Sequence, residues 1–422
     1  MSSSRTAVSS RPYLTSLMYS LPVRRLKEIL SHVVPNVTLG PVEELPSTQL
    51  PRLYTLSMSD ERKLLLSFAP SLAVRLLRQE ATILSSEATL VYFIAGSERR
   101  EMEGSPGSDI ERATTPPIGT PLKCMIPKLL KHSSNNREMA YPYSIFEQTE
   151  GAPLSTLSIY LSLPERREVD KQLGYMARNL ASLTSPSGTF GTVSRVLTDP
   201  FTPSSPTAPP TTGSKTWSEA FSVLLEGILR DGEDMAVLLP YEVVRSHSQR
   251  LSWRLDAVTL PRLVVLDAGS EANVMITRSS SDSSSIATGS GIDVTGLRSW
   301  SMGVFGDPLI SNAFEEPSEG FLEGWRESGE DLIEDGENAE VRLLLYRCYR
   351  AVVSIVTEYY RPHGDSSRRE LEGRRKLTSA LAELEKIDVA VNDALKRSRS
   401  LSSEAESSKR QKVEVKETAT EA

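Results

Sequence analysis

The sequence predicts an α+β fold of two lobes: a small strand-rich N-lobe and a larger helical C-lobe that carries an inserted β-hairpin. Three observations favour this fold class. Short strand-like apolar runs predominate before residue 148, whereas apolar residues at helical spacing predominate after residue 149. A break that contains Gly and Pro separates the two regions at residues 148–153. Two short strand-like runs interrupt the helical region within residues 273–297. We therefore expect a hinge at residues 148–153.

In the N-lobe, expected at residues 17–148, the strands come first. Residues 1–16 contain little that could be buried, so we expect a disordered N-terminus. Apolar residues on both sides of a Ser-Asp-Glu turn predict a hairpin whose second strand is Lys63–Phe68. A helix is expected over residues 71–94, with Glu80 and Glu87 as solvated carboxylates. Residues 103–121 are rich in Gly, Ser, Thr and Pro and indicate a flexible insert, and residues 143–147 indicate another strand.

In the C-lobe, expected at residues 149–395, the best-supported element is a helix that starts after Ser162. Ser162 and Glu165 form a capping-box pattern ahead of a buried stripe. The stripe consists of Val169, Leu173, Met176, Leu180 and Leu183. Further elements are expected as a helix from residue 217, a strand at 263–266, a hairpin of 273–276 with 292–297, and helices at 339–360 and 369–395. Residues 202–214 and 279–290 indicate flexible inserts.

Composition excludes several classes of protein. The chain has 422 residues, a formal net charge of −7 and two cysteines, Cys124 and Cys348. General nucleic-acid binding is not expected from this charge, and two cysteines are too few for a disulfide framework. No apolar run reaches the ~20 residues of a membrane span, and no secretory signal is visible. The four scattered histidines, expected on the surface, give zinc or thiol catalysis no support. These observations predict an intracellular protein that contacts no membrane.

The tail at residues 396–422 is polar and charged, and we expect it to be disordered. Lys396-Arg397 and Lys409-Arg410-Gln411-Lys412 are separated by eleven residues, the spacing of a bipartite nuclear import signal. This pattern suggests a nuclear or nucleocytoplasmic location and a nuclear import receptor as a possible partner. A solvated run of charge is an equally weighted alternative.

Three stretches carry a resemblance to a known family. Residues 263–274 read LVVLDAGSEANV, residues 294–300 read VTGLRSW ahead of Gly306-Asp307-Pro308, and residues 143–148 read YSIFEQ. The chain resembles the aminoglycoside phosphotransferase and choline kinase-like family over roughly residues 50–360, most closely its diverged fungal-type members. The resemblance implies a protein-kinase-like fold.

The resemblance also implies a set of site residues, because phosphoryl transfer needs a lysine on the phosphates, metal-binding groups and a base. Ser67 stands at the lysine position and Ser299 at the position of the Mg²⁺-binding Asp. Asp293 is the alternative metal ligand. Asn273 is the second metal position, one residue out of the family register relative to Asp267, the candidate base.

Three further points bear on these positions. Glu87 is a candidate cofactor-binding residue. The alternative for Asp267 is a structural carboxylate that begins a turn and accepts backbone N–H bonds. Residues 41–52 contain no glycine, although a backbone that approaches phosphates closely favours glycine.

Three hypotheses for the function follow. The leading one is a catalytically impaired, pseudokinase-type protein that acts through binding an unidentified protein, with no cofactor. The second is an active ATP-dependent small-molecule phosphotransferase with relocated ligands, which would need Mg²⁺ and ATP. The third is an adaptor that uses its C-terminal helix. The apolar stripe of that helix consists of Leu377, Leu381, Leu384, Ile387 and Val391.

Overall fold

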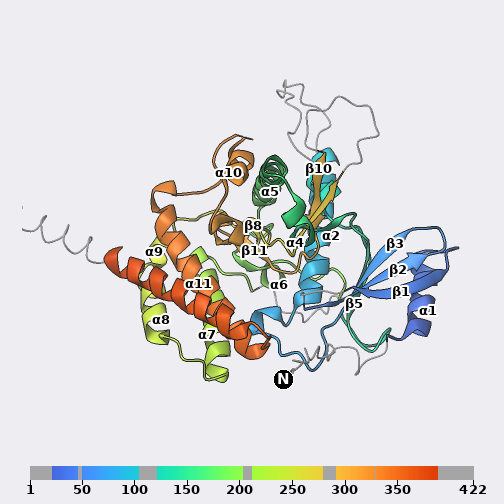
Figure 1. Ribbon diagram of the computed structural model, residues 1–422, viewed down its shortest axis with the longest axis horizontal. Coiled ribbons are helices and arrows are strands. Elements are labelled where there is room, and N and C mark those ends of the chain that lie inside the picture. Colours follow the sequence, from blue (N-terminus) through green and yellow to red (C-terminus); the bar gives the residue numbers. More distant parts are fainter. Residues whose placement is uncertain are drawn as a thin grey trace, which may run out of the picture.

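The computed structural model describes residues 21–45, 50–103, 121–202, 212–278, 291–327 and 329–387, and the side chains of 98–103 are not considered. The expected disordered N-terminus, nearly all of the insert at 103–121, most of that at 202–214, the insert at 279–290 and the tail at 396–422 lie outside these residues. Within them the chain forms a sheet-rich N-lobe beside a larger helical C-lobe (Figure 1). The predicted bilobal α+β fold is confirmed.

The N-lobe is a five-stranded antiparallel sheet with strand order β1-β2-β3-β5-β4. Its strands are β1 (Leu39–Leu45), β2 (Arg52–Met58), β3 (Lys63–Phe68), β4 (Leu129–Ser133) and β5 (Tyr143–Glu147). Successive side chains of a strand point to opposite faces. Leu64 and Leu66 of β3 pack on the face covered by α1 (Val23–Val33), whereas Leu65 packs on the face covered by α2 (Ile83–Glu103). The predicted hairpin and its second strand are therefore present.

The helix expected over residues 71–94 begins later and ends later. α2 spans Ile83–Glu103, and it is preceded by an irregular segment with one 3₁₀ turn at Arg78–Glu80. Glu80 is buried, so the expectation of a solvated carboxylate is wrong for this residue. One of its oxygens accepts a hydrogen bond from the backbone N–H of Leu77 at 2.8 Å. That bond fixes a turn where the periodicity alone had predicted a helix.

The segment ahead of α2 is anchored to helices of the C-lobe. Two N–H groups of the Arg361 guanidinium donate to the Glu80 carboxylate at 2.7 and 2.8 Å, just after the end of α11 (Ala339–Tyr360). Arg78 pairs with Asp231 and Asp234 of α7 (Trp217–Asp234). The N-terminal end of α2 is thus held by the C-lobe rather than by the sheet.

The chain passes between the lobes where the hinge was predicted. β5 ends at Glu147 and β6 (Ala152–Pro153) pairs with β9 (Val274–Arg278) in the C-lobe. Gly151 has a φ of +98°, and a Cβ at this position would lie 2.2 Å from the carbonyl oxygen of Ile276. Only glycine fits this backbone and this approach.

Two small sheets lie in the C-lobe. β9 pairs with β10 (Ile292–Leu297), which is the predicted inserted hairpin, to give the order β10-β9-β6. The second sheet, β7-β11-β8, consists of β7 (Gly191–Thr192), β8 (Arg262–Val265) and β11 (Gly303–Gly306). Its central strand, β11, follows β10 in the chain and so connects the hairpin to this second sheet.

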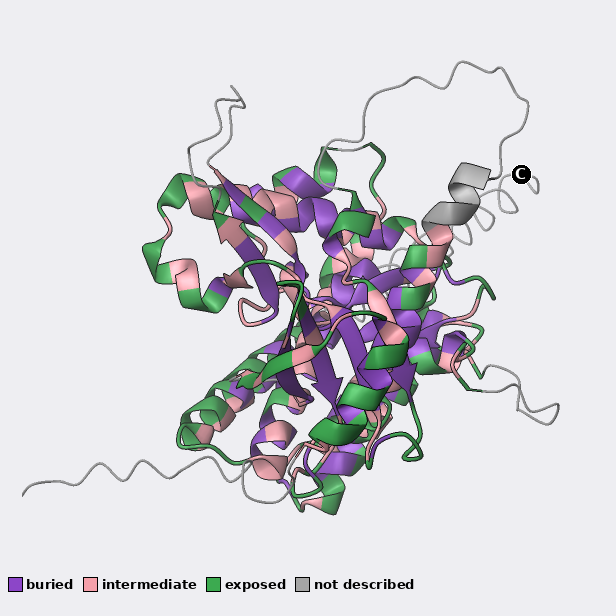
Figure 2. Ribbon diagram, turned by 90° about the vertical axis from the view of Figure 1, so that its right-hand side faces the viewer, coloured by how far each residue is buried: buried purple, intermediate pink, exposed green. Residues whose placement is uncertain are grey.

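The helices of the C-lobe surround a large apolar core (Figure 2). α5 (Leu163–Ser182) begins with the predicted capping box of Ser162 and Glu165. The other helices of the C-lobe are α4 (Leu154–Leu157), α6 (Val193–Val196), α8 (Tyr241–Arg250), α9 (Ser252–Leu255), α10 (Glu319–Arg326) and a last helix at 366–387, while the short α3 (Leu122–Met125) precedes β4. In the described part of the chain no helix is long and apolar enough to cross a membrane.

The motif Gly306-Asp307-Pro308 has a structural role in this fold. Asp307 is fully buried, and its carboxylate accepts hydrogen bonds from Arg342 at 2.7 Å and from the Tyr346 hydroxyl at 2.8 Å. The backbone N–H of Leu309 donates to its other oxygen at 3.1 Å. A buried charge is stable only when it is paired and hydrogen-bonded in this way. The motif therefore ties β11 to α11.

Candidate functional site

The second small sheet brings the two sequence motifs side by side. β8 is buried and delivers Asp267, while β11 pairs with β8 in the register Gly303 with Val265. The loop between β10 and β11 therefore lies against the turn that follows β8. The backbone N–H of Leu266 donates to the carbonyl of Met302 at 3.0 Å, and that of Arg298 donates to the carbonyl of Asn273 at 2.7 Å.

Asn273 and Ser299, the two positions assigned to metal binding, contact each other directly. The amide Nδ2 of Asn273 donates to the backbone carbonyl of Ser299 at 3.1 Å, and its Oδ1 accepts from the backbone N–H of Ser299 at 2.8 Å. Both residues are buried. Each polar atom of the Asn273 side chain thus already has a backbone partner, which fixes the loop.

Glu87 reaches the same loop from α2. Its Oε1 accepts a hydrogen bond from the backbone N–H of Trp300 at 2.9 Å, and the residue is 4% exposed. The expectation that Glu87 is a solvated carboxylate is therefore wrong. Burial raises the pKa of Glu87 to about 7, although the Trp300 N–H and the nearby hydroxyls of Ser299 and Ser67 oppose the rise. The negative charge of Asp267 adds to the rise.

Asp267 follows the end of β8 and is half-buried as a residue. Its Oδ1 is inaccessible to solvent and has no hydrogen-bond partner among the residues that the structure describes. Burial raises the pKa of Asp267 to about 6. Asp267 and Glu87 are thus two neighbouring carboxyl groups with raised pKa values: at pH 7 Glu87 is about half protonated, whereas Asp267 is mostly charged.

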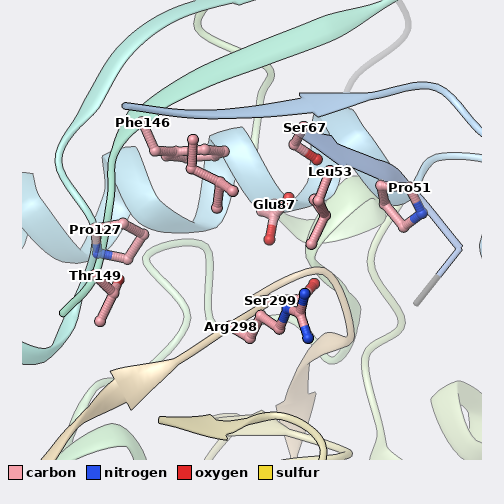
Figure 3. Close-up of a pocket in the computed structure, with 10 residues that line it drawn as sticks. Pro51, Leu53, Ser67, Glu87, Pro127, Phe146, Thr149, Arg298 and Ser299 are labelled. Carbon is pink, nitrogen blue, oxygen red and sulfur yellow. The ribbon is translucent and has the colours of Figure 1, made fainter. Parts of the chain in front are cut away.

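Ser67, Glu87 and Ser299 line a small cavity between the lobes, whereas Asp267 and Asn273 do not (Figure 3). Glu87 lies between the strand that carries Ser67 and the loop that carries Arg298 and Ser299. The volume of the cavity is about 10 Å³, roughly what a single water molecule needs. The other lining residues are Pro51, Leu53, Leu65, Pro127, Phe146 and Thr149.

Asp293 does not join this group. It is exposed on β10, where it pairs with Thr277 of β9, and it does not line the cavity.

Arg298 does line the cavity, and sequence reasoning missed this residue. Its position immediately before Ser299 in the motif at residues 294–300 could have identified Arg298 as a candidate site residue. Burial lowers the pKa of the Arg298 guanidinium from its ordinary value. One of the histidines expected on the surface, His132, is also buried.

The residues present do not fit Mg²⁺-ATP in the way the resemblance implies. Ser67 and Ser299 carry hydroxyl groups where the resemblance implies a lysine and a metal-binding carboxylate, and the Asn273 amide already bonds the backbone of Ser299. Among the described residues, no group of three or more His, Cys, Asp or Glu side chains could hold a metal ion. Ligand pockets commonly measure about 300–1,000 Å³, far above the cavity found between these lobes.

Comparison with solved structures identifies the fold. A protein assigned as a fructosamine-3-kinase from Thermobifida fusca matches with a TM-score of 0.52 and 13% identity, over 86% of this chain and 98% of that one. One from Haemophilus somnus matches with a TM-score of 0.52 and 11% identity, over 84% and 97%. A protein assigned as an aminoglycoside phosphotransferase from Ralstonia eutropha matches with a TM-score of 0.54 and 9% identity, over 87% and 99%.

These matches show that the chain has the bilobal fold of aminoglycoside phosphotransferase-like and fructosamine-3-kinase-like proteins. The predicted kinase-like fold is confirmed over most of the chain. No protein-family model matches the sequence, and no curated protein matches it.

Proposed function

We propose that this protein is a catalytically impaired member of the kinase-like fold that acts by binding another protein. The observation that carries the proposal is the environment of Glu87. Its carboxyl group is buried, faces Ser67 where the resemblance places a lysine, and accepts the Trp300 N–H. A lysine that binds phosphates needs a charged carboxylate beside it, whereas burial raises the pKa of Glu87 to about 7, so that this carboxyl group is only partly charged at neutral pH.

The metal side of the site supports the same conclusion. Ser299 offers a neutral hydroxyl, and that hydroxyl lies 2.9 Å from the hydroxyl of Ser301. Mg²⁺ is usually bound through carboxylates and phosphate oxygens. Losing one well-placed electrostatic stabiliser commonly costs about 10²–10³ in rate. With the lysine and the metal carboxylate both replaced, phosphoryl transfer is expected to fall to background.

The alternative is an active phosphotransferase, and one observation favours it. Oδ1 of Asp267, which has no hydrogen-bond partner in the described part of the chain, could accept a proton from a substrate hydroxyl. A relocated metal site would also require Asp293 to face Asp267, but Asp293 is exposed on β10 away from the cavity lining. The impaired form is therefore the better-supported function.

The adaptor hypothesis receives less support from the last helix. Leu377, Ala380 and Leu384 are buried in the core of the C-lobe, and Leu381 and Ile387 are partly buried against it. Val391 lies outside the described residues. The described part of the apolar stripe is thus that of a docked helix, with no free apolar face for a partner helix.

Isothermal titration calorimetry with Mg²⁺-ATP tests the proposal on the full-length protein. We expect no binding in the micromolar range and no transfer of phosphate to hydroxylated or aminated small molecules. Asp293→Ala is the matched variant. Micromolar, metal-dependent binding in the wild type that is lost in this variant would establish the relocated-site enzyme instead.

We also propose a nuclear or nucleocytoplasmic location, on the basis of the two basic clusters of the tail. Each cluster supplies a separate set of charge-assisted contacts to an acidic receptor. The proposal depends on the sequence alone, because these residues lie outside the described part of the chain.

A further inference from the structure

The aromatic ring of Phe201 joins the two lobes. Phe201 follows α6 in the C-lobe, and its ring packs edge-on against two residues of the N-lobe. The ring centroids are 5.7 Å from Tyr92 of α2 and 5.1 Å from His132 of β4. His132 is itself fixed, because its Nδ1 lies 2.8 Å from the Ser144 hydroxyl on β5. We call this contact of Phe201 with Tyr92 and His132 the interlobe latch.

A single carboxylate holds the turn that presents the ring. Oδ1 of Asp199 accepts a hydrogen bond from the backbone N–H of Phe201 at 2.8 Å. Oδ2 of Asp199 accepts one from the hydroxyl of Thr202 at 2.6 Å. The Asp199 side chain therefore closes the turn at both ends, and the bond to the Phe201 N–H fixes the backbone from which the ring projects.

Thr202 has the properties of a modification site. Its side chain is exposed, and Pro203 follows it in the sequence, so it forms the Thr-Pro dipeptide that proline-directed protein kinases modify. We propose that Thr202 is a phosphorylation site whose modification opens the interlobe latch. The proposal is independent of the proposed function, because the kinase and its ATP belong to another protein.

The chemistry explains the direction of the effect. The Thr202 Oγ attacks the γ-phosphorus of ATP, a new O–P bond forms, the β–γ bridging bond breaks, ADP leaves and the hydroxyl proton passes to the kinase. The hydrogen bond to Asp199 is then lost. A phosphate with about −1.5 to −2 charge stands beside the Asp199 carboxylate instead. The repulsion opens the turn and withdraws the Phe201 ring from β4.

The chain offers a matched control for accessibility. Ser185-Pro186 is the same type of dipeptide in the same lobe, but Ser185 is only 7% exposed. The remaining Ser-Pro and Thr-Pro residues are Ser105, Thr115, Thr120 and Ser205. In a full-length variant with these four changed to Ala, a proline-directed kinase and ATP should phosphorylate Thr202 and leave Ser185 unmodified. Absence of phosphate on Thr202 by mass spectrometry would overturn the proposal.

Hydrogen exchange then tests the latch itself. Phosphorylation should raise the exchange rates of residues 199–202 and of β4 at least tenfold. Phe201→Ala should raise the β4 rates without any phosphate, because it removes the ring. Thr202→Val removes only the neutral hydroxyl and should change the rates less than threefold. Unchanged exchange in the phosphorylated protein, or an equal rise in T202V, would overturn the electrostatic mechanism.

Discussion

Replacing Glu87 by glutamine should stabilise the protein at alkaline pH. Burial raises the pKa of Glu87 from 4.5 to about 7, so the folded state binds the proton more tightly than the unfolded state. The stabilising effect of protonation is complete below pH 4.5 and is lost as the pH rises through 7. At pH 8 the buried carboxylate is charged, which costs about 3 kcal/mol, since a tenfold change in proton affinity is worth about 1.4 kcal/mol.

Glutamine keeps the shape of the side chain and removes the charge. Its Oε1 can still accept the hydrogen bond that the Trp300 N–H makes to Glu87. Glu87→Gln should therefore have a free energy of unfolding about 3 kcal/mol above that of the wild type at pH 8. The advantage should fall below about 1 kcal/mol at pH 5, where Glu87 is protonated in the folded state. Urea denaturation of both proteins at pH 8 and at pH 5 measures these two differences.

A residual pH dependence should remain in the variant. Burial also raises the pKa of Asp267, from 3.8 to about 6, so its contribution is lost as the pH rises through 6. Glu242→Gln is the control, because that side chain is 91% exposed. A Glu87→Gln protein that is less stable than the wild type at pH 8, or whose stability difference does not change with pH, would refute the reasoning.

Three further predictions concern other parts of the chain. Arg342→Ala leaves Asp307 buried without its main partner and should lower the free energy of unfolding by about 3–5 kcal/mol in urea denaturation. Gly151→Ala forces a side chain onto the Ile276 carbonyl at positive φ and should cost about 1–3 kcal/mol in the same assay. Alanine at the basic residues of 409–412 should shift a tagged protein from the nucleus toward the cytoplasm under fluorescence microscopy.

A specific result would contradict each of these predictions. Arg368→Ala removes an exposed ion pair and should change the free energy of unfolding by less than about 1 kcal/mol. If R342A lost no more stability than R368A, the buried pair of Arg342 and Asp307 would not contribute as predicted. Gly364→Ala faces open space, and a loss as large as that of G151A would mean that the close approach at the hinge is unimportant. If the tail variant has the same distribution between nucleus and cytoplasm as the unaltered protein, the basic clusters are a solvated run of charge and not an import signal.

The sequence predicted those helices and strands whose formation depends on residues close together in the chain. α5 was predictable because both its capping box and its buried stripe lie within a few turns of one helix. β3 was predictable with its observed bounds, since a turn signal precedes it and a proline follows it. The fold class followed from the order of such elements along the chain.

The environment of the candidate site could not be predicted in the same way. Glu87 and Trp300 are 213 positions apart, and Glu80 and Arg361 are 281 apart. A charged residue within a helical pattern is predicted to be solvated unless its partner, which lies far away in the sequence, is known. Sequence reasoning selected Ser67, Glu87 and Ser299, which line one cavity, but it could not tell that Asp293 is elsewhere or that the cavity is so small.

The anchoring of the segment before α2 affects how the lobes can move. The bonds from Glu80 to Arg361 and from Arg78 to Asp231 and Asp234 fasten the start of α2 to the C-lobe. Glu87 and the Trp300 N–H add a link one turn further along. Rotation at Gly151 would therefore carry the five-stranded sheet past α2, rather than turning the sheet and α2 together. In mechanical terms the start of α2 is fastened to the larger body, and a displacement of the sheet relative to that body would be a sliding of the sheet over the helix.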